Sequence, residues 1–263
     1  MLFKSWRRKR AAARPFPPSW EAILRQRFGF WSRMDEQDRA ELRRHILVFL
    51  NEKRVEGAAG QEITDEVRVL IAAHACLLLL HRDTDYYPGV GTILVYPHAY
   101  VAESKRVGPA GVVTEERGVR LGESWHGVSS ALSGGPIVLA WDHVLHGAAD
   151  IHDGQNVALH EFAHALDAEE GSVNGAPLLD RRSMYAAWAR VLGAEYDDLV
   201  RAVVQHRPHV LDAYGASNPA EFFAVATETF FEKPASMKAR HPALYEQLAA
   251  FYKQDPAVST TSR

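Results

Sequence analysis

The sequence predicts an α+β domain that is mostly helical and carries a small mixed sheet. Two observations lead to this prediction. Segments with apolar residues at helical spacing fill both ends of the chain, whereas three short β-branched runs are grouped between residues 86 and 145. The chain has 263 residues, of which 47% are hydrophobic, and this is enough for one large globular domain. We expect that domain to span residues 19–253.

The two ends of the chain lack the patterning of the central segments. Residues 1–18 are rich in arginine and contain three prolines, so they are expected to form a flexible basic arm. No apolar segment follows the paired Arg7 and Arg8, which argues against an export signal. Residues 254–263 are polar and are expected to be a frayed tail.

Seven segments have the periodicity or the cap signals of helices. In chain order they are Ser19 to Phe28, Asp38 to Lys53, Thr64 to Leu80, the segment around His160, Asp180 to Val204, Pro219 to Phe231 and Pro242 to Lys253. Ser19 and Asp180 are candidate N-caps. The third segment is almost wholly apolar after Val67, and a helix that is apolar on all sides is buried. It is therefore the predicted core helix.

Three strands are predicted in the middle of the chain. They are Thr92 to Tyr96, the weaker Gly111 to Thr114, and Pro136 to Trp141, which follows two glycines. The third strand directly precedes the segment around His160. It can be read as an edge strand that pairs with an extended peptide, or as an ordinary core strand.

The central motif is His160-Glu161-Phe162-Ala163-His164. On a helix it places His160 and His164 one turn apart on one face, where two imidazoles can bind one Zn²⁺. Glu161 beside them can take a proton from a zinc-bound water. The alternative is a helix with two partly buried histidines and no metal. The apolar flanks argue against it, because burying His, Glu and His together is costly unless they are paired or bind a metal.

The third zinc ligand has to come from another segment, because catalytic zinc takes three protein ligands. A metzincin would have Gly and His where this chain has Asp167 and Glu170, which argues against that class. The segment that begins with Asn218 and Pro219 offers Glu221 and Glu228, seven residues apart on one helix face. Glu221 could also complete a capping box with Asn218. Spacing alone leaves both glutamates as candidates.

A resemblance favours one of them. The segments His160 to Asp167 and Tyr214 to Ala224 resemble the Mlc titration factor A family of zinc metallopeptidases, and they are similar to the catalytic domain of anthrax lethal factor. Matching stretches extend the resemblance to about residues 15–253, and they are Gly122 to Trp125, Leu139 to Trp141 and Asn174 to Pro177. The resemblance implies a gluzincin-like fold, one Zn²⁺ per chain, Glu221 as third metal ligand and Tyr214 at the active site.

The implied activity is a zinc-dependent peptidase of the bacterial cytoplasm that hydrolyses peptide bonds with a zinc-bound water activated by Glu161. Aminopeptidase action is one option, and the absence of a G-x-M-x-N segment leaves endopeptidase action open. The phenol of Tyr214 could donate to the oxyanion. Asp167 could hold a ligand imidazole or end the helix. The alternative function is a regulatory protein that titrates a transcriptional repressor.

Composition limits the partners. The net charge of −3 predicts no direct nucleic-acid binding. The longest apolar run, Val69 to Leu80, is too short to span a bilayer, so no membrane association is expected. The single cysteine, Cys76, excludes an intrachain disulfide and fits a reducing, cytoplasmic compartment. His143 and His146 are read as surface or core histidines rather than a second metal site.

Overall fold

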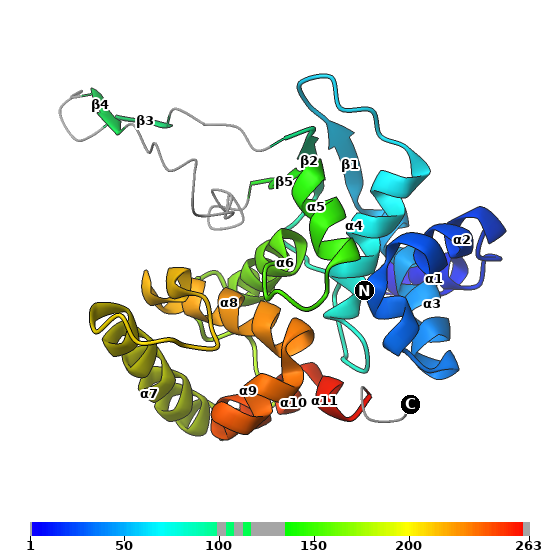
Figure 1. Ribbon diagram of the computed structural model, residues 1–263. Helices are drawn as coiled ribbons and strands as arrows, with labels where there is room; N and C mark the ends of the chain where they lie inside the picture. The colour runs from blue at the N-terminus through cyan, green and yellow to red at the C-terminus, as the bar shows by residue number, and fades with distance from the viewer. Residues whose placement is uncertain (1, 99–103, 108–112, 117–134, 260–263) are drawn as a thin grey trace.

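The computed structural model describes residues 2–98, 104–107, 113–116 and 135–259. The N-terminal helices lie on one side of the molecule and the C-terminal helices on the other (Figure 1). Between them are a small sheet and the helices α4 (Asp65–Leu77), α5 (Trp141–Ala149) and α6 (Val157–Asp167). Helix α4 contacts the N-terminal layer, and α6 contacts α8 (Pro219–Glu232) of the C-terminal layer. The mostly helical α+β fold is confirmed.

The N-terminal layer contains α2 (Pro18–Arg27), the 3₁₀ helix η1 (Gly29–Arg33) and α3 (Glu36–Glu52). Helix α3 begins where the Asp35 carboxylate accepts a hydrogen bond from the backbone N–H of Asp38 at 2.8 Å. Helix α4 begins where Thr64 caps the N–H of Val67, and every residue from Val69 to Leu77 is buried. The predicted core helix is thus confirmed, although it ends three residues early. Ser19 lies inside α2 and is not its cap.

The N-terminus differs from the expected flexible arm. Residues Leu2–Ala12 form helix α1, which docks on α3. The guanidinium of Arg8 binds the carboxylates of Glu52 and Asp85, each at 2.7 Å. Lys4 donates to Asp85 at 2.9 Å. Local composition could not indicate this docking, because the partners lie 44 to 81 residues away in the chain.

The central sheet has three strands, β1 (Arg54–Gly57), β2 (Thr92–Tyr96) and β5 (Ile137–Ala140), in the order β1-β2-β5. All three are parallel, with Val95 opposite Leu139 in the β2–β5 register, so this sheet is not mixed. Strands β3 (Ser104–Val107) and β4 (Val113–Glu116) form a separate antiparallel pair. The weaker predicted strand overlaps β4, and its first two residues lie outside the described residues. The sequence did not indicate β1 or α5.

The C-terminal layer contains the remaining helices. They are the 3₁₀ helix η3 (Ala168–Glu170), α7 (Met184–Val204), the 3₁₀ helix η4 (Ala213–Ala216), α8, α9 (Pro234–Arg240), α10 (Pro242–Tyr252) and α11 (Pro256–Ser259). Asp180 does not cap α7, and its exposed carboxylate pairs with Lys253 at 3.0 Å. The expected frayed tail is ordered as far as α11, because Asp255 accepts a hydrogen bond from the Tyr245 hydroxyl at 2.6 Å.

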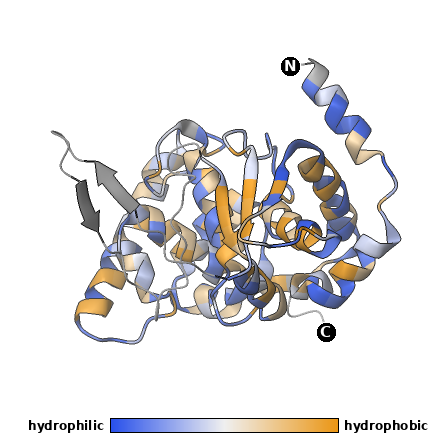
Figure 2. Ribbon diagram, turned by 90° about the horizontal axis from the view of Figure 1, so that it is seen from above, coloured by the Kyte–Doolittle hydropathy of each residue, from blue (hydrophilic) through white to orange (hydrophobic). Residues whose placement is uncertain are grey.

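Helix α6 occupies the centre of the core, and all its residues are buried. The ring of Phe162 packs against Phe49 and Tyr87, with ring centroids 5.8 and 5.1 Å apart. Apolar strands of the sheet lie in the middle of the molecule beside it (Figure 2). Within the described residues, no helix combines the length and apolar character needed to cross a membrane.

Candidate metal centre

Helix α6 positions the two histidines of the central motif. It begins at Asn156, whose side-chain oxygen accepts from the N–H of Leu159 at 3.1 Å. One turn further, the Nε2 atoms of His160 and His164 lie 3.2 Å apart. Each histidine is only 1% exposed. The predicted pair therefore shares one face of a buried helix.

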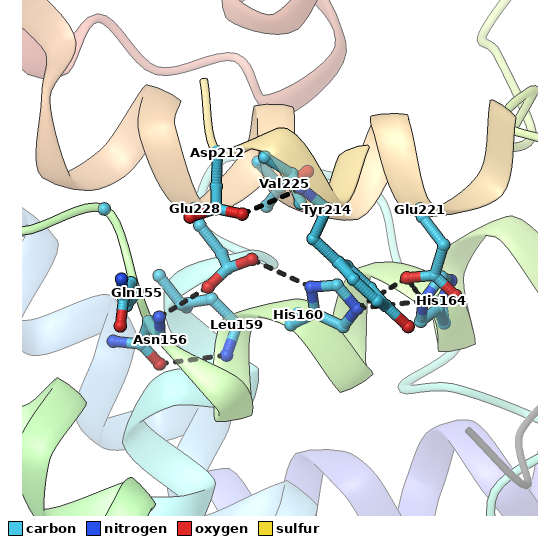
Figure 3. Close-up of polar contacts among 12 residues, drawn as sticks. Gln155, Asn156, Leu159, His160, His164, Asp212, Tyr214, Glu221, Val225 and Glu228 are labelled. Carbon is cyan, nitrogen blue, oxygen red and sulfur yellow. Dashed lines mark hydrogen bonds and ion pairs between the residues drawn. The ribbon is translucent and has the colours of Figure 1, made fainter. Parts of the chain in front are cut away.

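Helix α8 brings a carboxylate to these nitrogens. The Oε2 atom of Glu221 lies 3.0 Å from His160 Nε2 and 3.3 Å from His164 Nε2 (Figure 3). One ligand atom from each of the three residues falls within 4.8 Å of the others, and no other such group of His, Cys, Asp or Glu occurs among the described residues. Two imidazole nitrogens and one carboxylate oxygen are the donor set of a catalytic zinc site. These residues therefore fit the metal.

Glu228 occupies the other side of the same imidazole. Its Oε1 atom lies 2.8 Å from His160 Nδ1, and its Oε2 atom accepts from the backbone N–H of Asn156. The two glutamates of α8 thus take opposite nitrogens of His160, and only Glu221 also reaches His164. Spacing could not separate them, because both lie on one face of the helix. Glu228 fixes the orientation of the His160 ring, as acceptors behind metal ligands do.

The electrostatics of the cluster favour a cation. Burial alone lowers the pKa of His160, but Glu228, Glu221 and Glu161 outweigh it and raise that pKa to about 10. Burial raises the pKa of Glu221, yet hydrogen bonds and charge from the two imidazoles hold it well below its usual range. Burial also raises the pKa of Glu228. Three carboxylates thus act on the imidazole of His160 in a largely buried site.

Tyr214 reaches the site from the turn η4. Asp212 caps this turn by accepting from the N–H of Tyr214 at 2.8 Å. Gly215 lets it pack closely, because a Cβ there would lie 3.1 Å from Leu199 and 3.3 Å from Val225. The phenol points toward Glu221 and His164 (Figure 3), and its ring centroid lies 6.0 Å from that of His160.

The Tyr214 hydroxyl is a donor at neutral pH. Burial, followed by the negative charges of Glu221 and Glu161, raises its pKa to about 12. A phenol with this pKa keeps its proton while it hydrogen-bonds to a developing negative charge. The position implied by the resemblance thus holds a neutral donor next to the three candidate ligands.

Comparison with known proteins agrees with this geometry. The sequence pattern that defines the family described as glucose-regulated metallo-peptidase M90 matches residues 3–253. The chain belongs to this family. It is 41% identical to an uncharacterized protein of Synechocystis over 97% of this chain and 90% of that protein. It is 34% identical to Mlc titration factor A of Klebsiella pneumoniae, over 79% of this chain and 76% of the relative.

A third relative extends the coverage. Mlc titration factor A of Cronobacter sakazakii is 32% identical over 94% of this chain and 89% of its own length. The resemblance to the titration-factor family is thereby confirmed. The stretch Gly122 to Trp125 contributed to that resemblance, and it lies outside the residues that the structure of this M90 metallopeptidase describes.

Glu161 of this M90 metallopeptidase lies on α6 between the two histidines and is 1% exposed. Its negative charge contributes to the raised pKa of both His160 and Tyr214, which places it within electrostatic reach of the cluster. Asp167, by contrast, is the last residue of α6, and its Oδ2 atom accepts from the N–H of Gly175 at 2.7 Å. Its hydrogen bond therefore holds this loop, and its charge also interacts with His164.

One supporting residue of the M90 site, Glu232, was not predicted from the sequence. Glu232 accepts from the N–H of Gly154 and of Gln155 at 2.8 and 3.0 Å, and from the side-chain amide of Asn156 at 3.0 Å. It thereby holds the loop that begins α6. The available signal was a third glutamate on the buried helix, one turn beyond Glu228.

His143 and His146, the two other histidines considered as metal ligands, contact aspartates. His146 Nε2 lies 2.6 Å from the carboxylate of Asp153, and the backbone N–H of His143 donates to Asp142 at 2.9 Å. Neither histidine belongs to the metal-binding group of the described residues. Their interpretation as surface or core histidines stays a prediction.

Proposed function

We propose that the chain is a zinc-dependent peptidase in which His160, His164 and Glu221 hold one Zn²⁺ and Glu161 is the general base. The single observation that supports this most is the convergence of two imidazole nitrogens and one carboxylate oxygen at 3.0 to 3.3 Å, in a buried site of a metallopeptidase family member. A zinc ion held there supplies a Lewis acid that polarises a substrate carbonyl and lowers the pKa of water.

The protein's own residues move the protons. Glu161 takes a proton from the attacking water and delivers it to the leaving amine, as a general base and then a general acid. The neutral phenol of Tyr214 donates a hydrogen bond to the carbonyl oxygen as it becomes an oxyanion. Glu228 accepts from His160 Nδ1, which keeps Nε2 directed at the ligand cluster. The low exposure of the cluster strengthens each of these interactions.

Strand β5 supports an extended peptide as the substrate. In the described part of the chain it pairs with β2 on one side only, and it contacts α6. A peptide that adds to its outer edge would use backbone hydrogen bonds for affinity. We propose that the scissile bond is aligned in this way. Aminopeptidase and endopeptidase action are both compatible with such an edge.

A peptide-library digest tests this proposal. The wild type should cleave peptides, and Glu161→Gln should lose the activity while it keeps its metal. Glu62→Gln is the matched control, because Glu62 is an exposed glutamate away from α6 and α8. Comparing free with N-acetylated peptides separates the two modes of cleavage. Absence of cleavage in a zinc-loaded wild type, or equal rates in the wild type and Glu161→Gln, would overturn the proposal.

A second function is proposed because two of the relatives are named Mlc titration factor A. In this reading the chain binds a transcriptional repressor in the cytoplasm, a location that the buried Cys76 also favours. Glu161→Gln is nearly isosteric, so it should abolish cleavage and leave repressor capture intact. A pull-down and a cleavage assay on the same variant test this. Loss of both activities in a folded, zinc-loaded variant would mean that binding runs through the active site.

A further inference from the structure

Charge is separated along this chain. The first 20 residues contain six Lys and Arg and no Asp or Glu, whereas all 33 Asp and Glu and the other 24 of the 30 Lys and Arg follow. The body of the protein is therefore clearly negative and helix α1 strongly positive. The net charge of −3 conceals this separation, because it averages the two parts.

One side of α1 is used for docking. Lys4, Arg8 and Ala11 recur at helical spacing and share a face. Arg8 binds Glu52 and Asp85, and its guanidinium lies 4.7 Å from the ring centroid of Tyr86. Ala11 is buried, at 2% exposure. These contacts fix the orientation of the helix and therefore determine which side faces outward.

The outward side combines cations with an exposed aromatic ring. Trp6 is 58% exposed, although its side chain is large and apolar. Arg10, one turn later, places its guanidinium 5.6 Å from the Trp6 ring centroid. Arg7, Lys9 and Arg10 are exposed and form no ion pair with any described residue. Figure 2 shows α1 projecting from the body.

We infer that the outward face of α1, made by Trp6, Arg7, Lys9 and Arg10, binds the surface of an anionic phospholipid bilayer. A short basic helix with an exposed indole matches the layers of a bilayer interface, where phosphates pair with arginine and lysine and the indole sits just below them. Eleven residues are too few to span a bilayer, so the helix lies in the interface plane.

A bilayer fits this face better than a polynucleotide does. A long polyanion that follows the protein surface would meet the excess of carboxylates on the body, which repels it. A flat anionic membrane needs to touch only the projecting helix. Each basic residue beside an anionic membrane strengthens binding by about fivefold, so three of them contribute about 10²-fold.

Vesicle co-sedimentation of the full chain tests this inference. The probes are vesicles of phosphatidylcholine with about 30 mol% of the anionic phosphatidylglycerol, and vesicles of phosphatidylcholine alone. The wild type should bind the anionic vesicles and be released by about 0.5 M salt. The variant Arg7→Ala/Lys9→Ala/Arg10→Ala should bind about 10²-fold more weakly. Trp6→Ala should weaken binding by about tenfold, through lost apolar contact.

A charge-matched control isolates the helix. Arg182→Ala/Arg190→Ala/Arg240→Ala removes three exposed arginines from the body and should bind as the wild type does. Thermal melts confirm that both triple variants fold. Equal binding by both triple variants, or equal binding to the two kinds of vesicle, would overturn the inference. Retention on DNA at the same salt, with no binding to vesicles, would replace the membrane with a nucleic acid as partner.

Discussion

Helices α4 and α6 are both buried and each carries a buried histidine, but the pKa values of the two histidines shift in opposite directions. His74 of α4 donates from Nδ1 to the backbone carbonyl of Leu70 at 2.8 Å, and burial lowers the pKa of His74 to about 4. His160 of α6 is equally buried, but carboxylates raise its pKa to about 10. The difference comes from the neighbours, because α4 packs among apolar residues and α6 packs along α8 with its glutamates.

This contrast separates a structural histidine from a candidate ligand. A buried imidazole without charged neighbours stays neutral and satisfies itself with a backbone group. An imidazole faced by carboxylates on both nitrogens lies in a field that attracts a proton or a metal ion. Burial of a histidine is therefore uninformative alone, and the residues packed against it indicate its role.

The largest difference in zinc binding should appear between two single variants, His160→Ala and His74→Ala. His160→Ala removes a ligand and should abolish both zinc binding at micromolar concentrations and peptide cleavage. His74→Ala should lower the free energy of unfolding by roughly 1–3 kcal/mol through a cavity and leave zinc affinity unchanged. Metal titration and chemical denaturation of both variants check this. A zinc defect in His74→Ala equal to that in His160→Ala would show that the two histidines do not differ in role.

Tyr214→Phe should have the next largest effect. It removes the neutral donor and keeps the ring, so kcat should fall by about 10-fold to 10³-fold with zinc content unchanged. Steady-state kinetics beside metal analysis measure this. Tyr185→Phe is the matched control, since its hydroxyl contacts Pro177 and Leu179 rather than the cluster. An unaltered kcat in Tyr214→Phe would give Tyr214 a packing role only.

Glu228→Gln tests the role of the second carboxylate of α8. The amide keeps the shape but weakens the charged acceptor behind His160, so zinc affinity should fall by about 10-fold to 100-fold. The expected loss is smaller than for a direct ligand. Competition with a chelator of known affinity measures it. A complete loss of zinc in Glu228→Gln, with Glu221→Gln unaffected, would exchange the roles of the two glutamates.

The smallest effect concerns pH. Burial raises the pKa of Glu232 to about 9. The hydrogen bond from the Asn156 amide offsets part of this rise, and the negative charge of Glu228 adds to it. The folded state then holds a proton that the unfolded state releases above its ordinary carboxyl pKa. The stabilisation is full below pH 4.5 and is lost as pH rises toward 9. Glu232→Gln should therefore flatten the fall in unfolding free energy from pH 5 to pH 9, as denaturant titrations measure. Parallel curves for both proteins would contradict this.

The sequence predicts the helices that have strong local signals. The core helix α4 is continuous in apolar residues, and α8 carries an Asn-Pro start, so each was predicted close to its observed bounds. The motif on α6 needs only helical geometry to bring His160 and His164 together. Glu221 required the resemblance, because spacing on α8 leaves Glu228 equally placed.

The missed features depend on contacts between distant segments. Helix α1 is ordered by Arg8 reaching Glu52 and Asp85, and no local pattern encodes that pairing. Likewise, α7 starts at Met184 rather than near Asp180, whose exposed carboxylate pairs with Lys253. In both cases the side chains bind partners in distant segments, which local patterns do not indicate.

The most direct test of the central claim is the zinc content of the purified wild type, Glu161→Gln and Glu221→Ala proteins by mass spectrometry of the metal. We predict one Zn²⁺ per chain in the wild type and in Glu161→Gln, and little or none in Glu221→Ala after dialysis against a chelator. Full zinc occupancy in Glu221→Ala, or no bound zinc in a folded wild type, would contradict the assignment of His160, His164 and Glu221 as its ligands.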